Sequence, residues 1–221
     1  MTSADAPFPS VSPVGERRQA RLADARLAAV VDARRSREDL SDHLTALGGA
    51  SIDVLRLRDD TATEDELRTA ADVFRRVCDQ VGALFLVDRL PGLAVQVGAD
   101  GVHLGAVDLQ PDRARSVVGP DLLIGRAVRS TEAVDASGDE DVDLLVVGED
   151  RSATERDELV SHAARWASHP WFASVGDVAE AAGLVRLGAR RLVAVAGALP
   201  DEDPAAACWE LRRTVAAEPL D

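Results

Sequence analysis

The chain has 221 residues and a formal net charge of −14, and its length suits one α/β domain. The excess of acidic residues argues against nucleic acid or an anionic membrane surface as a partner. All 25 basic residues are arginine, which excludes Schiff-base chemistry and a lysine clamp for phosphate. A bound anion must therefore be held by arginine side chains or by backbone N–H groups.

The two cysteines, Cys78 and Cys208, match no metal-binding spacing. We interpret them as buried thiols in a reducing compartment. No signal peptide or membrane span is visible in the sequence, and we expect a cytoplasmic protein.

Residues 1–15 combine several prolines with few apolar side chains, and we expect a flexible tail ahead of one folded domain at residues 16–221. A short helix is predicted at 16–26, and from there apolar strands alternate strictly with helices. The strands are predicted at 27–32, 52–57, 83–87, 101–104, 122–125, 143–147, 171–174 and 192–195. The clearest helix start is the capping box formed by Thr63 and Glu66.

Eight strand–helix pairs with short connections predict a parallel sheet, and in a chain of this length they predict a (β/α)8 TIM barrel. The alternative is a doubly wound open sheet. That fold more usually has fewer units and a glycine-rich turn after its first strand, and residues 32–35 contain no glycine.

Two carboxylates mark the middle of the chain. Asp88 follows the predicted strand 83–87, and Asp108 comes just after the next strand, 101–104. Because the carboxyl ends of barrel strands lie on the face that holds active sites, we expect both side chains at one rim. Two carboxylates there suit Mg²⁺, which also takes phosphate oxygens as ligands. The alternative is structural: Asp88 caps a helix and Asp108 stabilises a turn.

Arginines and glycines are also expected at this rim. The candidates for binding a ligand are Arg56, Arg58, Arg129, Gly176 and Gly197. Arginine pairs well with phosphate, and glycines after the last two strands would let backbone N–H groups approach an anion. Together these residues predict a phosphorylated small molecule as the ligand, although the glycines have turn formation as an alternative role. His103 lies in a short buried strand, which favours a core or hydrogen-bonding role.

The run at residues 98–105, GADGVHLG, with Asp88 and Arg89 before it and Asp108 after it, resembles thiamine phosphate synthase and its thiazole tautomerase relatives. The resemblance extends from residue 27 to the last helix. It implies a (β/α)8 barrel and a transferase reaction of thiamine biosynthesis. In that reaction a pyrimidine pyrophosphate ionises, and the nitrogen of a thiazole phosphate captures the cation while Mg²⁺ and basic groups neutralise the pyrophosphate.

The resemblance also implies roles for individual residues. By position, Asp88 and Asp108 correspond to the Mg²⁺ ligands of the family. Arg58 corresponds to the arginine of the family's Gln-x-Arg-x-Lys motif after the second strand. Gly176 corresponds to the second glycine of a Gly-Gly turn after the seventh strand.

Several positions depart from that family. Arg56 lies where the family has glutamine, and Asp60 lies where it has lysine, so a group that would bind pyrophosphate has become an acid. Arg129 replaces the histidine that the tautomerase branch would need for proton transfer. Two functions therefore stay open: a diverged Mg²⁺-dependent transferase that forms thiamine phosphate, and a non-catalytic or repurposed barrel that binds a phosphorylated metabolite or a protein partner. A homo-oligomer is also left open.

Overall fold

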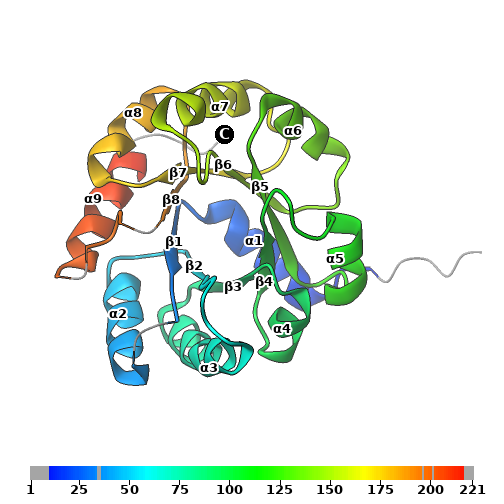
Figure 1. Cartoon of the computed structure of the whole chain (residues 1–221), viewed down its shortest axis with the longest axis vertical. Coiled ribbons are helices and arrows are strands. Elements are labelled where there is room, and N and C mark those ends of the chain that lie inside the picture. Colours follow the sequence, from blue (N-terminus) through cyan, green and yellow to red (C-terminus); the bar gives the residue numbers. More distant parts are fainter. Residues whose placement is uncertain (1–9, 34–35, 196, 201, 217–221) are drawn as a thin grey trace, which may run out of the picture.

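The computed structural model describes residues 10–33, 36–195, 197–200 and 202–216. Within this part of the chain, eight parallel strands form a closed barrel in sequence order, with β8 paired to β1 (Figure 1). The strands are β1 (Leu27–Val31), β2 (Val54–Leu57), β3 (Leu84–Asp88), β4 (Gly101–Leu104), β5 (Leu123–Val128), β6 (Leu144–Val147), β7 (Trp171–Val175) and β8 (Leu192–Ala194). The predicted TIM barrel is confirmed, and the open sheet is excluded.

Most of the helices surround the barrel and connect consecutive strands, whereas α1 precedes β1 and α9 follows β8 (Figure 1). They are α1 (Pro13–Asp24), α2 (Arg37–Gly49), α3 (Glu64–Val81), α4 (Pro91–Gln96), α5 (Pro111–Val118), α6 (Thr131–Ala136), α7 (Ala153–Trp166), α8 (Ala181–Arg186) and α9 (Pro204–Ala216), with the single-turn helices η1 (Ser137–Asp139) and η2 (Val178–Glu180). The predicted capping box of Thr63 and Glu66 is present at the start of α3. Among the described residues, no helix combines the length and the apolar composition that crossing a bilayer requires.

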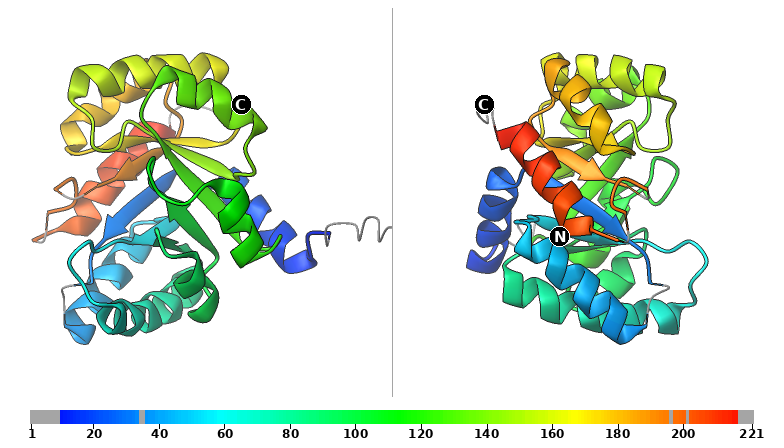
Figure 2. Two further views of the ribbon diagram at one scale, coloured as in Figure 1. Left: turned by 45° about the vertical axis from the view of Figure 1, so that its right-hand side comes forward. Right: turned by 90° about the vertical axis from the view of Figure 1, so that its left-hand side faces the viewer.

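The first helix differs from the expected flexible tail. α1 begins at Pro13, inside the range 1–15, because Ser12 caps it and is anchored to Asp121 by hydrogen bonds of 2.7 and 2.8 Å. The helix covers the amino-terminal end of the barrel, opposite the loops that follow the strands (Figure 2). Its Leu22 packs into the apolar interior of the barrel. Residues 1–9 of the expected tail lie outside the described residues.

The interior of the barrel has an apolar half and a polar half. Side chains alternate between the two faces of a strand, so every second residue points inward. Leu84, Leu86 and Phe172 belong to the apolar inner cluster that α1 closes. Nearer the carboxyl ends of the strands, Arg56 and His103 are almost completely buried. The polar half therefore lies toward the face where active sites of such barrels are found.

Helix α2 packs closely against α3 at Gly48. A Cβ atom at Gly48 would lie 2.4 Å from Val81 Cγ1, whereas a Cβ atom at Gly49 would meet no atom within 4 Å. We expect Gly48→Ala to lower the free energy of unfolding by about 1–3 kcal/mol through overpacking. Gly49→Ala is expected to leave it unchanged or to raise it by up to about 1 kcal/mol. Urea unfolding followed by circular dichroism measures both, and equal effects of the two alanines would contradict this packing.

Candidate functional site

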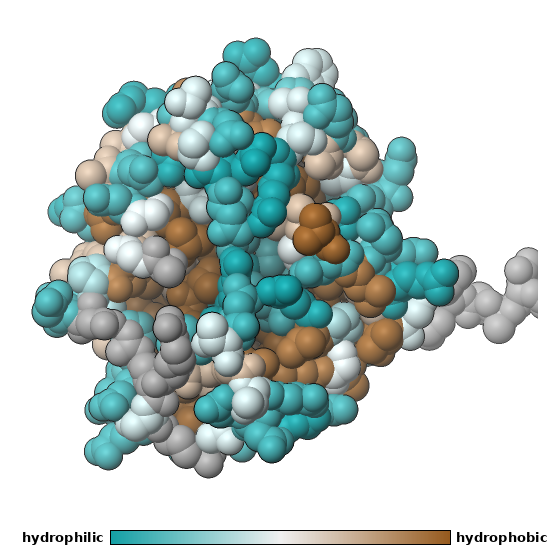
Figure 3. Space-filling model, in the orientation of Figure 1, coloured by the Kyte–Doolittle hydropathy of each residue, from teal (hydrophilic) through white to brown (hydrophobic). Residues whose placement is uncertain are grey.

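The loops after the strands surround two adjoining cavities, which we call the mouth of the barrel. The larger cavity has a volume of about 660 Å³ and the smaller one about 360 Å³, and Arg58, Asp59 and Asp60 line both. The larger cavity is also lined by Val30, Val31, Asp32, His43, Thr61, Glu149, Asp150, Val195, Gly197, Leu199 and Pro200. A hydrophilic band crosses this face of the molecule (Figure 3). The mouth is therefore polar and rich in carboxylates.

Beneath the mouth, Arg56, Asp88 and Glu149 form a buried ion-pair cluster. Arg56 Nε donates a hydrogen bond to Asp88 Oδ1 at 3.0 Å, and Nη2 donates to Asp88 Oδ2 at 2.6 Å. Nη2 also lies 3.4 Å from each Glu149 carboxylate oxygen. The side chains of Arg56 and Asp88 are only 1% and 4% exposed, so they form a desolvated, bidentate pair.

Burial and charge act in opposite directions on this cluster. Burial alone would lower the pKa of Arg56, but the charges of Asp88 and Glu149 raise it above its ordinary value. Burial alone would raise the pKa of Glu149, but Arg56 holds it well below its ordinary value. Glu149 also accepts a hydrogen bond from Arg58 Nη1 at 2.9 Å. Glu149 was given no role from the sequence, although it closely follows the apolar strand predicted at 143–147.

His103 lies beside this cluster, as its place in a buried strand predicted. Its Nε2 atom is 3.5 Å from Glu149 Oε2. The ring fits because residue 125 is glycine: a Cβ atom at Gly125 would lie 2.8 Å from His103 Nδ1. His103 thus belongs to the buried polar interior of the barrel.

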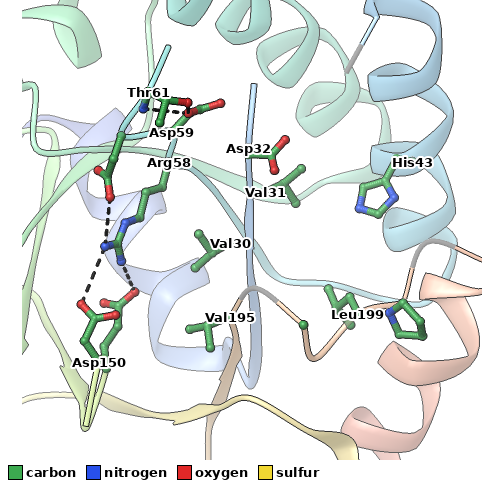
Figure 4. A pocket seen from close by; sticks show the side chains of 14 residues that line it. Val30, Val31, Asp32, His43, Arg58, Asp59, Thr61, Asp150, Val195 and Leu199 are labelled. Carbon is green, nitrogen blue, oxygen red and sulfur yellow. Dashed lines mark hydrogen bonds and ion pairs between the residues drawn. The ribbon is translucent and has the colours of Figure 1, made fainter. Parts of the chain in front are cut away.

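Three arginines at the rim pair with two half-exposed carboxylates. Arg58 reaches across the mouth (Figure 4), and its Nη2 lies 3.4 Å from Asp60 and 3.7 Å from Asp150. Arg89 Nη1 donates to Asp60 at 2.5 Å, and Arg129 Nη2 donates to Asp150 at 2.7 Å. Asp60 and Asp150 are 50% and 49% exposed. Water therefore weakens these pairs far more than the buried one.

Two residues of the rim have a left-handed backbone. Arg89 has φ 66° and Asp150 has φ 59°. Residues other than glycine rarely adopt this backbone conformation. It costs about 1–3 kcal/mol, and such strained residues cluster at functional sites. Both residues line a cavity of the mouth, so two of the strained positions of the backbone lie at this face.

The two carboxylates expected to bind Mg²⁺ both line the smaller cavity, but each already has other partners. Arg56 donates to both oxygens of Asp88. Asp108 Oδ2 accepts the N–H group of Gly105 at 2.7 Å, and Oδ1 lies 3.5 Å from Arg89 Nε. Among the described residues, no three His, Cys, Asp or Glu side chains are grouped to hold a metal ion. The residues present therefore do not fit Mg²⁺, and Asp108 has the alternative role of stabilising a turn.

The glycines expected to bind phosphate have different surroundings. Gly176 N donates to Glu180 Oε2 at 3.1 Å, so a carboxylate of the chain itself accepts this N–H group. Gly197 lines the larger cavity and has φ 95°, a conformation that favours glycine. Arg58 lines both cavities of the mouth. Arg129 is not among the lining residues of either cavity, and its Nη2 pairs with Asp150, which lines the larger one.

The chain is similar to known proteins along most of its length. Residues 27–198 match the family model described as thiamine monophosphate synthase. The chain is 36% identical over 208 residues to the thiamine-phosphate synthase of Thermobifida fusca, covering 89% of this chain and 95% of that protein. It is 38% identical over 210 residues to the thiamine-phosphate synthase of Acidothermus cellulolyticus, covering 90% and 99%.

A solved structure supports the fold. The thiamine phosphate pyrophosphorylase from Pyrococcus furiosus superposes on this chain with a TM-score of 0.75, and the match covers 90% of this chain and 98% of that one. The two sequences are 24% identical, so this likeness shows the barrel fold alone.

Proposed function

This chain belongs to the thiamine monophosphate synthase family, and we propose from that membership that it joins a pyrimidine pyrophosphate to a thiazole phosphate to form thiamine phosphate. The carbon–oxygen bond to pyrophosphate breaks with its electron pair leaving on pyrophosphate, and the thiazole nitrogen donates its lone pair to the resulting cation. The family match across residues 27–198 carries the proposal. We also place the chain in the cytoplasm, because both cysteines are free and buried.

The arginines at the rim of the mouth supply the positive charge that the leaving group requires. Arg58, Arg89 and Arg129 pair with the half-exposed carboxylates of Asp60 and Asp150. Ion pairs exposed to water stabilise a protein little. A pyrophosphate group carries more charge than a carboxylate and accepts two parallel hydrogen bonds from a guanidinium, so it can replace these carboxylates. The arginines then stabilise the negative charge that develops on the departing pyrophosphate. Mg²⁺ does not enter this proposal, because arginines contact both of its expected carboxylates.

Glu149 has the complementary role toward positive charge. Its carboxylate is buried, lines the larger cavity, and stays ionised because Arg56 holds its pKa well below the ordinary value. A fixed negative charge in a largely desolvated position favours the pyrimidine cation as it forms. The hydrogen bond from Arg58 fixes the orientation of this carboxylate.

We expect Arg58→Ala to lower kcat/KM for thiamine phosphate formation by about 10- to 100-fold, because one or two charge-assisted hydrogen bonds to phosphate are lost. The assay mixes purified protein with both precursors and measures thiamine phosphate by its fluorescence after oxidation. Arg68→Ala is the matched control, since it removes an exposed arginine of α3 that pairs with Glu64, and it should leave the rate unchanged. An equal rate for wild type and Arg58→Ala would contradict the role of Arg58.

A specific observation favours a second candidate function, a barrel that binds a phosphorylated metabolite or a protein partner without catalysis. The carboxylates that line the larger cavity are Asp32, Asp59, Asp60, Glu149 and Asp150. So much negative charge opposes the further charge that pyrophosphate gains on leaving more than it opposes a ligand with a single phosphate or a protein partner. Saturable binding of one precursor by a wild-type protein that forms no product would support this second function and refute the first.

A further inference from the structure

Arg56 places a cation at the carboxylate where the family resemblance implies Mg²⁺. It lies where the family has glutamine, and its nitrogens contact the two Asp88 oxygens at 3.0 and 2.6 Å. Two parallel hydrogen bonds of this length are typical of a strong charge-assisted pair. Because a guanidinium stays charged in proteins, Asp88 has a permanent counter-ion.

A divalent ion at Asp88 would have to displace this guanidinium or share the carboxylate with it. Mg²⁺ binds carboxylate oxygen at about 2.0–2.1 Å and Arg56 Nη2 lies 2.6 Å from Asp88 Oδ2, so a shared carboxylate would hold two cations close together in a desolvated place, where they repel each other strongly. The displaced guanidinium would stay buried and would keep only its 3.4 Å contacts with Glu149. A buried charge that loses its partner is strongly unfavourable. The packing therefore favours Arg56 over a metal at this carboxylate.

Asp108, the second carboxylate, has its partners in the loops at the rim of the barrel. Its Oδ2 atom accepts the Gly105 N–H group at 2.7 Å, and its Oδ1 atom lies 3.5 Å from Arg89 Nε. A metal bound through Oδ2 would compete with the hydrogen bond that closes the turn. Each of the two carboxylates that would share a cation thus has an arginine beside it.

We propose that the Arg56 guanidinium replaces the divalent cation as the counter-ion of Asp88, so that the mouth binds its phosphorylated ligand without a metal at Asp88 and Asp108. Arg56 acts as a positioning residue, since it contacts Glu149, which accepts a hydrogen bond from Arg58 at 2.9 Å. The choice of ligand rests on the proposed function, whereas the replacement of the metal does not.

The test is a titration of the purified full-length protein with Mn²⁺, which loses its sharp electron paramagnetic resonance signal when it binds. The proteins are wild type, Arg56→Gln, Asp88→Asn and the double variant Arg56→Gln/Asp88→Asn, with Arg68→Gln as a control for loss of one arginine. Circular dichroism first establishes which variants are folded. We expect Arg56→Gln to bind Mn²⁺ at least about tenfold more tightly than wild type, and the double variant to lose this gain.

For the wild-type protein, we expect any Mn²⁺ binding that depends on Asp88 to have a dissociation constant above about 1 mM. Binding depends on Asp88 if the Asp88→Asn variant weakens it. Asp88-dependent binding below that concentration in wild type would overturn the proposal, as would a folded Arg56→Gln protein with unchanged affinity. If Arg56→Gln does not fold, the comparison of wild type with Asp88→Asn decides alone. No substrate enters the titration, so its outcome is independent of whether the protein forms thiamine phosphate.

Discussion

Asp60→Lys is expected to raise the rate of thiamine phosphate formation by roughly a hundredfold. Asp60 lines both cavities of the mouth and lies 2.5 Å from Arg89 Nη1 and 3.4 Å from Arg58 Nη2. It therefore competes with pyrophosphate for two cations and also repels it. Lysine would release both arginines and reverse the local charge, and each change contributes roughly tenfold once screening of a half-exposed group by water and salt is allowed for.

The measurement compares initial rates of wild type, Asp60→Asn and Asp60→Lys under the same conditions. Asp60→Asn keeps the size of the side chain and removes one negative charge. Its initial rate is expected to be roughly tenfold higher than that of wild type. Asp139→Lys makes the same change of charge on the exposed η1 segment that precedes β6, away from the mouth, and should leave the rate unchanged. A rise of equal size in Asp139→Lys would show that net charge, and not the position of Asp60, controls the rate.

The wild-type rate is itself expected to be about ten- to a thousandfold below that of a family enzyme that carries lysine at this position. A normal wild-type rate would show that Asp60 does not oppose the pyrophosphate. No product from either wild type or Asp60→Lys would favour the barrel that binds a ligand without catalysis.

Asp100→Ala is expected to lower the free energy of unfolding by about 3–5 kcal/mol, a large part of the stability of an ordinary domain. Asp100, within the motif at residues 98–105, accepts hydrogen bonds from Phe85 N at 3.0 Å, Arg18 Nε at 2.9 Å and Arg75 Nη1 at 2.9 Å. Its side chain is 8% exposed, so alanine would leave a buried N–H group and two arginines without this carboxylate. The residue thus joins α1, α3 and β3.

Urea unfolding at neutral pH measures this loss. Asp79→Ala is the control, because Asp79 also pairs with Arg75 but is largely exposed, and about 0.5 kcal/mol or less is expected for it. Equal losses in the two variants would show that burial of Asp100 contributes nothing.

The contribution of Asp100 should also depend on pH. Burial alone would raise the pKa of its carboxyl group, but the hydrogen bonds from Phe85, Arg18 and Arg75 lower it below 3.8, the ordinary value. A carboxyl group with a lowered pKa in the folded state stabilises the protein above its unfolded-state pKa, and this contribution is lost as the pH falls through the folded-state value. The stability difference between wild type and Asp100→Asn should therefore be constant near neutral pH and shrink below about 3.8. A difference that stays constant into acid would contradict this.

The barrel and the residues at its mouth followed from local patterns in the amino-acid sequence. The strand at 101–104 and the capping box of Thr63 and Glu66 were predicted where the structure has them. Such features depend on hydrogen bonds and side-chain periodicity within a few residues. Strand ends also predicted which residues gather at one face, because all strands of a parallel barrel end there.

The partners of those residues were decided by the tertiary structure. Arg56 lies 32 residues before Asp88 and 93 before Glu149, and only closure of the barrel brings the three together. Arg56 lies in β2 and Arg58 is the residue just past its end, yet their side chains are 1% and 27% exposed. The strength of an ion pair depends on distance and on removal from water, and neither quantity can be read from neighbouring residues in the chain. A carboxylate that sequence places at a metal site is therefore, in this fold, the partner of a buried arginine.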